Sequence, residues 1–180
     1  LYVCEQSFDY MGKSYVRRGF LARVLLEEFG KGQVFPHERT LSGPKVDRLD
    51  LMRATRGNLS PVFGLLADEG GTLVSQIANA CPWEPTYTIA EKSGVVNRFW
   101  VLDHPGPVQG ICEAASKGGI FIADGHHRYE TAIAYRDEVR AARKAAGLSC
   151  PAMGELESDW IMMFCVPLND PGLAIFPTHR

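Results

Sequence analysis

A chain of 180 residues, of which 46% are hydrophobic, is long enough to bury a substantial core and fits a single globular domain. Its formal net charge of −2 argues against general attraction to DNA or RNA, and no stretch reaches the roughly 18 apolar residues that a membrane span needs. The five cysteines are scattered and form no C-x-x-C pair, which is typical of reduced thiols in a cytoplasmic protein. The chain opens without Met inside a strand-like run and stops abruptly, so we expect an excerpt of a longer protein.

The first part of the chain predicts a β-hairpin, a polar loop and a helix. Residues 1–5 and 14–28 are expected to be strands joined by a turn at residues 10–13. Residues 30–40 are too polar and too rich in glycine and proline for regular structure. The Ser-Gly-Pro sequence at residues 42–44 then predicts the start of a helix.

Further strands alternate with short helices along the remainder of the chain. Apolar runs predict strands at residues 60–66, 85–90, 97–103, 160–167 and 173–176. An amphipathic pattern predicts a helix at residues 72–80, a second short helix is expected at residues 108–117, and the polar stretch 147–158 is expected to be a loop. In the third of the strands we expect Phe99 or Trp100 to face inward. Hairpins mixed with a few helices predict an α+β (mixed α/β) fold around a mixed sheet.

The stretch at residues 120–132 is the most informative, because a strand runs through a tight turn into a helix. Residues 120–123 are apolar and predict a buried strand. A helix from Tyr129 onward is predicted by charged residues such as Arg136 alternating with an apolar face of Ala132, Ile133, Val139, Ala142 and Ala146. The free N–H groups and positive dipole end of such a helix favour an anion, and Gly125 lets the backbone approach it closely. The turn is therefore predicted to be a phosphate or nucleotide site.

Polar side chains gather at this turn and in an earlier loop. The turn brings a carboxylate, two imidazoles and a guanidinium to the helix start, from Asp124, His126, His127 and Arg128. The earlier group consists of His37, Glu38, Thr40, Lys45, Asp47 and Arg48. We expect the two groups to line one cleft, because neither has enough local apolar content to explain so many polar side chains. The alternatives are a capped helix with surface histidines, and a solvated loop before a salt-bridged helix.

Four segments, in chain order, carry a resemblance that covers nearly the whole chain. They are His37-Glu38-Arg39-Thr40, then Lys45 with Asp47-Arg48, then residues 122–132, and finally Pro177-Thr178-His179-Arg180. Together they resemble the successive signatures of an uncharacterised bacterial and archaeal family, the domain of unknown function one-thousand-fifteen. Members of that family are longer at both ends, which agrees with an excerpt.

The turn at residues 124–128 also resembles the corresponding turn of the ParB/sulfiredoxin superfamily, whose members bind nucleotides at this strand-to-helix junction. The resemblance implies a ParB/sulfiredoxin-like core around the turn. Free serine kinases of this superfamily carry a similar Asp-Gly-His-His-Arg motif and a glutamate that acts as base. Sulfiredoxins carry a reactive cysteine where this chain has His126, so redox repair is not expected.

These residues are suited to a phosphotransferase, which needs a cationic clamp, a metal contact and a base. Catalytic roles are predicted for Glu38, His127 and Asp124, with Asp124 also contacting magnesium. Nucleotide or phosphate contacts are predicted for Gly125, His126, Arg128, Lys45, Arg48, His37 and Thr40. We expect Mg²⁺ as cofactor, ATP or ADP as nucleotide, and a small hydroxyl compound such as free serine as acceptor.

Two other functions stay open. The first is a nucleotide- or ligand-binding regulatory module without catalysis. The second is a metal-dependent hydrolase in which zinc, manganese or iron is held by His37, His126, His127, His179 and Asp124. Adjacent histidines at positions 126 and 127 would point in diverging directions, which weakens joint chelation of one ion.

Overall fold

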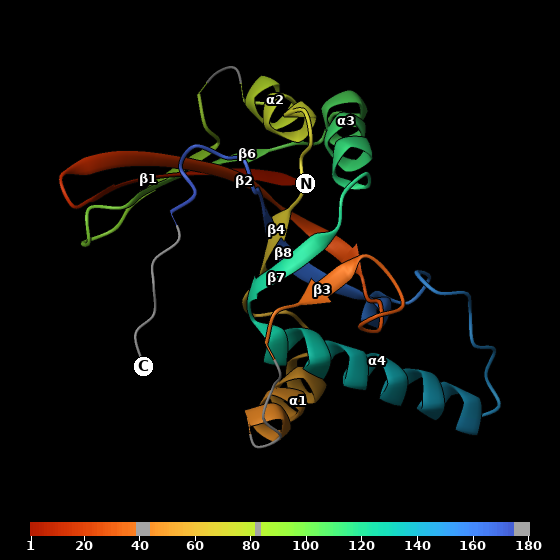
Figure 1. The fold of residues 1–180 in the computed structure, drawn as a ribbon. Coiled ribbons are helices and arrows are strands. Elements are labelled where there is room, and N and C mark those ends of the chain that lie inside the picture. The colour runs from red at the N-terminus through yellow and green to blue at the C-terminus, as the bar shows by residue number, and fades with distance from the viewer. Residues whose placement is uncertain (39–43, 82–83, 175–180) are drawn as a thin grey trace. The chain divides into compact units, whose positions relative to one another are not determined.

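The computed structural model describes residues 1–38, 44–81 and 84–174, with Pro44 and Lys45 described by their backbone only (Figure 1). Within these residues, eight strands form a mixed sheet in the order β3-β7-β4-β8-β2-β1-β6-β5. The strands are β1 (Tyr2–Tyr10), β2 (Lys13–Leu25), β3 (Val34–Pro36), β4 (Val62–Leu66), β5 (Tyr87–Ala90), β6 (Val96–Val101), β7 (Ile120–Asp124) and β8 (Trp160–Pro167). The helices are α1 (Pro44–Thr55), α2 (Thr72–Asn79), α3 (Pro105–Ala115), α4 (His126–Ala145) and the 3-10 helix η1 (Glu157–Asp159). The predicted mixed α/β fold is confirmed.

The chain forms two compact units. The first contains residues 1–21, 65–119 and the described residues from 165 onward, and the second contains residues 22–64 and 120–164. Among the described helices, none combines the length and the apolar character that crossing a membrane requires.

The first unit contains the predicted hairpin. β1 and β2 pair antiparallel with Tyr10 opposite Lys13, and the turn residues Met11 and Gly12 have φ values of 50° and 73°. Two residues with positive φ make a type I′ turn, whose twist matches that of the flanking strands. β1 pairs on its other side with β6, and β6 pairs with β5, so the strands predicted at residues 85–90 and 97–103 are neighbours in the sheet.

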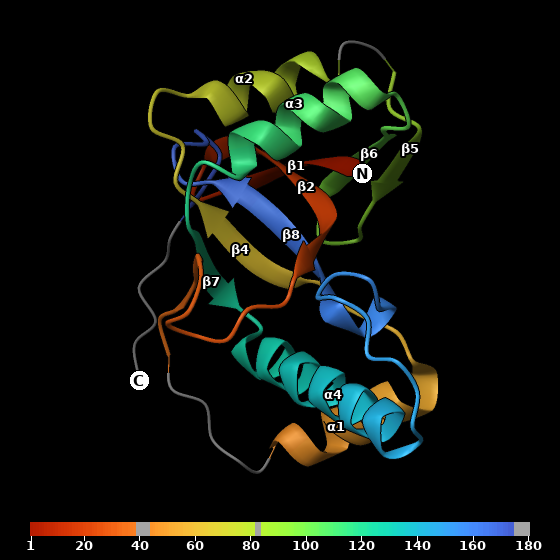
Figure 2. The same cartoon turned by 90° about the vertical axis from the view of Figure 1, so that its right-hand side faces the viewer.

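Helices α2 and α3 lie side by side over one face of β1 and β6 (Figure 2). Their apolar stripes are buried, with Leu73 and Ile77 from α2 and Ile111 from α3. The start of α2 is capped by Asp68, whose carboxylate accepts the N–H groups of Leu73 at 2.9 Å and Val74 at 3.0 Å. Both helices were predicted, and α3 begins three residues before its predicted start at residue 108.

One buried side chain on β6 is polar. Asn97 is buried, whereas Phe99 and Trp100 are only half-buried. The Asn97 amide donates to Glu91 Oε1 at 2.8 Å and accepts from Gln6 Nε2 at 2.7 Å, so its burial leaves no polar atom unsatisfied. A hydrogen-bond partner that lies 91 positions away along the chain cannot be inferred from a local alternation of apolar residues.

In the second unit, the short strand β3 runs parallel to β7, with Pro36 opposite Ile122. The prediction that residues 30–40 lack regular structure was therefore wrong at β3. A proline fits there because β3 lies at the edge of the sheet, where its missing N–H group needs no partner. Since parallel strands end at the same edge, the residues that follow β3 and β7 come close together.

Helix α4 packs beside α1, and its buried face differs from the predicted one (Figure 1). The buried residues are His126, Tyr129, Thr131, Ala132 and Arg136. Ala142 and Ala146, which were predicted to face the core, are exposed. The two helices are also joined by Arg53, whose guanidinium donates to both carboxylate oxygens of Glu138, at 2.9 and 2.5 Å.

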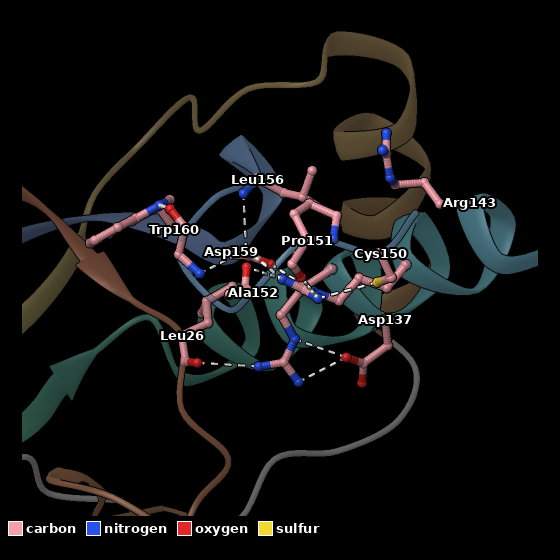
Figure 3. A network of polar contacts seen from close by, with 12 residues as sticks. Leu26, Asp137, Arg143, Cys150, Pro151, Ala152, Leu156, Asp159 and Trp160 are labelled. Carbon is pink, nitrogen blue, oxygen red and sulfur yellow. Dashed lines mark hydrogen bonds and ion pairs between the residues drawn. The ribbon is translucent and has the colours of Figure 1, made fainter. Parts of the chain in front are cut away.

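The second half of α4 is held by charged side chains instead of apolar ones (Figure 3). Arg140 binds the fully buried carboxylate of Asp159 through two hydrogen bonds of 2.9 and 2.7 Å. Arg136 donates to the carbonyl of Leu26 at 3.2 Å and to Asp137 at 2.8 Å. Arg136 can be buried because its guanidinium is hydrogen-bonded. The contacts of Arg136 and Arg140 hold the second half of α4 in place, and the first residues of the same helix belong to the candidate site.

The last predicted strand, at residues 173–176, is not formed in its described part. Leu173 and Ala174 lie outside any strand, and the N–H group of Leu173 donates to the carbonyl of Asp170 at 3.0 Å, which closes a turn. The remaining two positions of that prediction lie outside the described residues.

Candidate functional site

Helix α4 begins directly after β7, and its N-cap residue is a glycine, which has no side chain to cap it. Its N-cap residue, Gly125, has φ 92° and ψ 25°, a left-handed conformation. The first intrahelical bond runs from the N–H group of Tyr129 to the carbonyl of Gly125, at 3.0 Å. The earlier N–H groups of a helix have no partner within it, so this uncapped end carries partial positive charge. The alternative in which Asp124 caps the helix is not the observed arrangement.

Glycine at position 125 is favoured by its backbone angle, and a larger residue would also have to displace the end of the Arg128 side chain. A Cβ atom there would lie 2.9 Å from Nε and 3.0 Å from Cζ of Arg128. The guanidinium therefore lies against the turn, where any larger residue would displace it.

Arg128 connects the start of α4 to two other segments. Its Nη2 donates to Asp124 Oδ2 at 2.7 Å, and its Nη1 donates to Ser60 Oγ at 3.0 Å and to the carbonyl of Pro61. These bonds hold the helix start to the residues that precede β4. The guanidinium that was predicted to bind phosphate is therefore already hydrogen-bonded to the protein.

Two histidines, one from each polar group, are in direct contact. The backbone N–H of His37 donates to Nε2 of His126 at 3.2 Å, and the rings meet edge to face with centroids 4.5 Å apart. Nδ1 of His37 donates to the carbonyl of Ile122 at 2.5 Å. His126 is only 4% exposed. Its burial, followed by the charge on nearby His37, holds the pKa of His126 below the ordinary histidine range.

Glu38 follows His37 and reaches solvent. Its side chain is 58% exposed, and Oε1 lies 3.6 Å from Nε2 of His37. An exposed carboxylate next to an imidazole is available both to a proton and to a ligand.

A cavity of about 480 Å³ is lined by residues from both polar groups. Its polar lining includes Glu38, Arg48, Asp124, His126, His127 and Arg128. The structure therefore places Glu38 and the turn at residues 124–128 in one cleft, as expected from the sequence. The roles predicted for these residues stay predictions.

Several lining residues were not predicted. An apolar wall is made by Leu51, Met52 and Leu59, and Leu59 is 69% exposed. A large apolar side chain in the Gly-Asn-Leu-Ser segment at residues 57–60 is the signal that could have located this wall, because such loops are usually polar. Thr131 also lines the cavity, since it lies one turn after His127 on α4.

Two lining polar atoms are buried without a hydrogen-bond partner in the described part of the chain, namely His127 Nε2 and Thr131 Oγ1. The exposed Arg48 likewise has neither an ion pair nor a hydrogen bond to any described residue. Arg48 is thus a cation at the cavity that is available for an anionic ligand.

Some predicted site residues are not brought to the cavity. His37 contacts His126 but is not part of the lining, and Asp47 is exposed outside it. Thr40 and His179 lie outside the described residues, as does the side chain of Lys45. Across residues 1–38, 44–81 and 84–174, no group of three or more His, Cys, Asp or Glu side chains is arranged to hold a metal ion.

Comparison with known proteins gives a family but no activity. A family model described as "Protein of unknown function (DUF1015)" matches residues 1–180. Neither the curated proteins nor the solved structures contain a match to this chain.

Proposed function

Since the chain belongs to this family of unknown function, we propose from its own geometry that the cavity binds a nucleotide and that the protein transfers a phosphoryl group to a small hydroxyl compound. The observation that carries the proposal is the uncapped start of α4 inside a cavity of about 480 Å³. Ligand cavities usually have volumes of about 300–1,000 Å³, so a nucleotide is an appropriate size.

The phosphate end of the ligand is assigned to the start of α4. The N–H groups of the first turn of α4 attract an anion. Arg48 supplies a positive charge from α1, and Arg128 keeps the turn in shape through its bonds to Asp124 and Ser60. The base of the nucleotide is assigned to the apolar wall that contains Leu59.

Magnesium would be held by the nucleotide phosphates and Asp124. The Asp124 side chain is 75% exposed, and only its Oδ2 is paired with Arg128. Mg²⁺ in phosphotransfer sites commonly has one or two carboxylate ligands together with phosphate oxygens and water, so a single carboxylate fits. The ion would neutralise charge on the phosphates.

The chemical step is assigned to Glu38. The acceptor oxygen attacks the terminal phosphorus, its proton passes to the Glu38 carboxylate, and the bond to the departing nucleoside diphosphate breaks. His127, at the start of α4, contacts the transferred group. The resemblance of the turn to that of free serine kinases, which use a glutamate as base, supports this assignment.

The test begins with binding. Thermal unfolding is measured with ADP, ATP, CTP and GTP, with and without Mg²⁺, and at least one nucleotide should raise Tm. The Arg48→Ala variant should lose most of this shift. The matched control, Arg23→Ala, removes an exposed arginine that pairs with Glu157 and lies over the Trp160 ring, and this variant should keep the shift.

Turnover is then followed as ADP release from ATP in the presence of small hydroxyl compounds, beginning with serine. Acceptor-dependent release supports the phosphotransferase. A tight nucleotide complex without turnover would favour the regulatory module instead, and no shift with any nucleotide would overturn the proposal.

A further inference from the structure

Glu38 is anchored to the rest of the site through the residue before it. β3 ends at Pro36, so Glu38 follows its last residue by two positions and receives no support from a strand or helix. Its Oε1 lies 3.6 Å from Nε2 of His37, which is too long for a hydrogen bond, so the peptide bond to His37 is what ties Glu38 to the site. The position of Glu38 therefore depends on what holds His37.

His37 is held at two points, one on its backbone and one on its ring. The backbone N–H donates to His126 Nε2 at 3.2 Å, and ring Nδ1 donates to the Ile122 carbonyl at 2.5 Å. The hydrogen bond from the His37 ring to Ile122 lies next to the last residue pair of β3 and β7, Pro36 and Ile122. The bond to His126 ties the same residue to the first turn of α4.

The hydrogen bonds also define which ring nitrogens carry protons. Nε2 of His126 is an acceptor, so a neutral His126 carries its proton on Nδ1. Nδ1 of His37 is a donor, so the ring carries a proton there and its Nε2 lies on the side of Glu38. These two hydrogen bonds fix the orientation of both imidazole rings next to Glu38.

We propose that His126 is a positioning residue that sets the distance between the catalytic base and the phosphate site, by accepting the His37 N–H group from the first position of α4. This inference rests on the proposed phosphotransfer. The same helical turn that attracts the phosphate also determines where Glu38 stands, so base and phosphate are placed as one unit. A misplacement of about 1 Å in such a site lowers rates by about 10²-fold.

Two amide substitutions of His126 separate this role from simple packing. In His126→Gln, the side-chain oxygen reaches the place of Nε2 and can accept the His37 N–H group, whereas in His126→Asn it reaches only the place of Nδ1. We expect kcat to fall by about 10²-fold in the Asn variant and to recover to within a few-fold in the Gln variant, with little change in the nucleotide KM.

The dependence on Glu38 is tested by a double-mutant cycle. If His126 acts through Glu38, adding His126→Asn to Glu38→Gln causes no further loss of kcat. Additive losses, or equal kcat values for the Asn and Gln variants, would overturn the inference.

Amide hydrogen exchange of the intact protein distinguishes failure of this inference from failure of the proposed function. The His37 amide should be protected in the wild type and in His126→Gln, and should exchange faster in His126→Asn, whereas the amides within α4 stay equally slow in all three. Normal protection of His37 in the Asn variant would show that His126 does not hold it, whatever the activity. If the His37 amide loses protection in His126→Asn but the wild-type protein binds no nucleotide, the His37–His126 contact is supported and the phosphotransferase is rejected.

Discussion

Arg128 and Asp124 form an ion pair across one turn at the start of α4, with Nη2 of Arg128 2.7 Å from Oδ2 of Asp124. The same guanidinium donates to Ser60 and Pro61 and lies against Gly125. A residue predicted from the sequence as a phosphate ligand is therefore also a support for the turn.

Arg128→Ala should weaken both binding and stability. The substitution removes the donor to the half-buried Pro61 carbonyl and to the exposed Asp124 carboxylate, which costs about 1 kcal/mol in the free energy of unfolding because water can replace the donor to Asp124. Nucleotide titration and urea unfolding measure the two effects. Unchanged nucleotide affinity in the variant would contradict any role of Arg128 in ligand binding.

Glu38→Gln should abolish turnover while leaving nucleotide affinity almost unchanged. The amide keeps the size of the side chain but cannot accept the proton, and general base catalysis contributes about 10²–10⁴-fold in rate. The rate of ADP release and the nucleotide Kd are the measurements. A parallel loss of both would place Glu38 on the metal or in the fold instead.

Gly125→Ala should be far more harmful than a comparable change elsewhere. Gly125 has φ 92° and would bring its new Cβ to 2.9 Å from Arg128, whereas Gly147 has φ 69° and nothing within 4 Å of that position. Gly147→Ala therefore reports the backbone strain alone. The difference in Tm between the two variants measures the displacement of Arg128, and equal values would show that the turn tolerates it.

The Asp159–Arg140 pair should make stability fall in acid. Burial alone would raise the pKa of Asp159, but the Arg140 ion pair and the N–H groups of Leu156 and Gly154 hold it below its ordinary value of 3.8. The folded state thus binds this proton less readily than the unfolded state, so the stabilisation is present above pH 3.8 and lost as pH falls through the folded pKa. Asp159→Asn should be less stable at neutral pH and show a shallower loss below pH 3.8, as measured by urea unfolding at each pH. Parallel acid curves for the two proteins would exclude this linkage.

Thiol labelling should separate four of the five cysteines into two classes. Cys112 and Cys150 are exposed and should react rapidly at pH near 8. Burial raises the pKa of Cys165 to about 12 and that of Cys4 to about 11, so these thiols should react only on unfolding. Mass spectrometry of the labelled native protein measures the result. Rapid labelling of Cys165 would show that its strand opens in the native state.

The elements that the sequence predicts well are those with a local cause. The hairpin turn follows from Met11-Gly12, and α4 from the periodicity after Tyr129. β3 could not be predicted, because three residues with a proline form a strand only when β7 lies beside them. The burial of Arg136 has the same kind of cause, since its partner Leu26 is 110 positions away.

The candidate site was predicted in its polar half and missed in its apolar half. Charged and imidazole side chains at a strand-to-helix turn indicate a site by their chemistry, as with Glu38 and Asp124. An apolar residue such as Leu51 has no such signature, because the same pattern on a helix usually marks a buried face. Only the packing of α1 against α4 shows that this side chain faces a cavity.

Because β3 and β7 pair in parallel, the two halves of the site come together largely independently of the sequence between the two strands. As long as Pro36 stays opposite Ile122, the residues after each strand emerge at one edge of the sheet, whatever the length of the intervening sequence. Insertions in the surface turn at residues 91–95 should therefore leave the site intact. Slippage of β3 by a single residue would instead turn His37 to the opposite face and separate the two halves of the site.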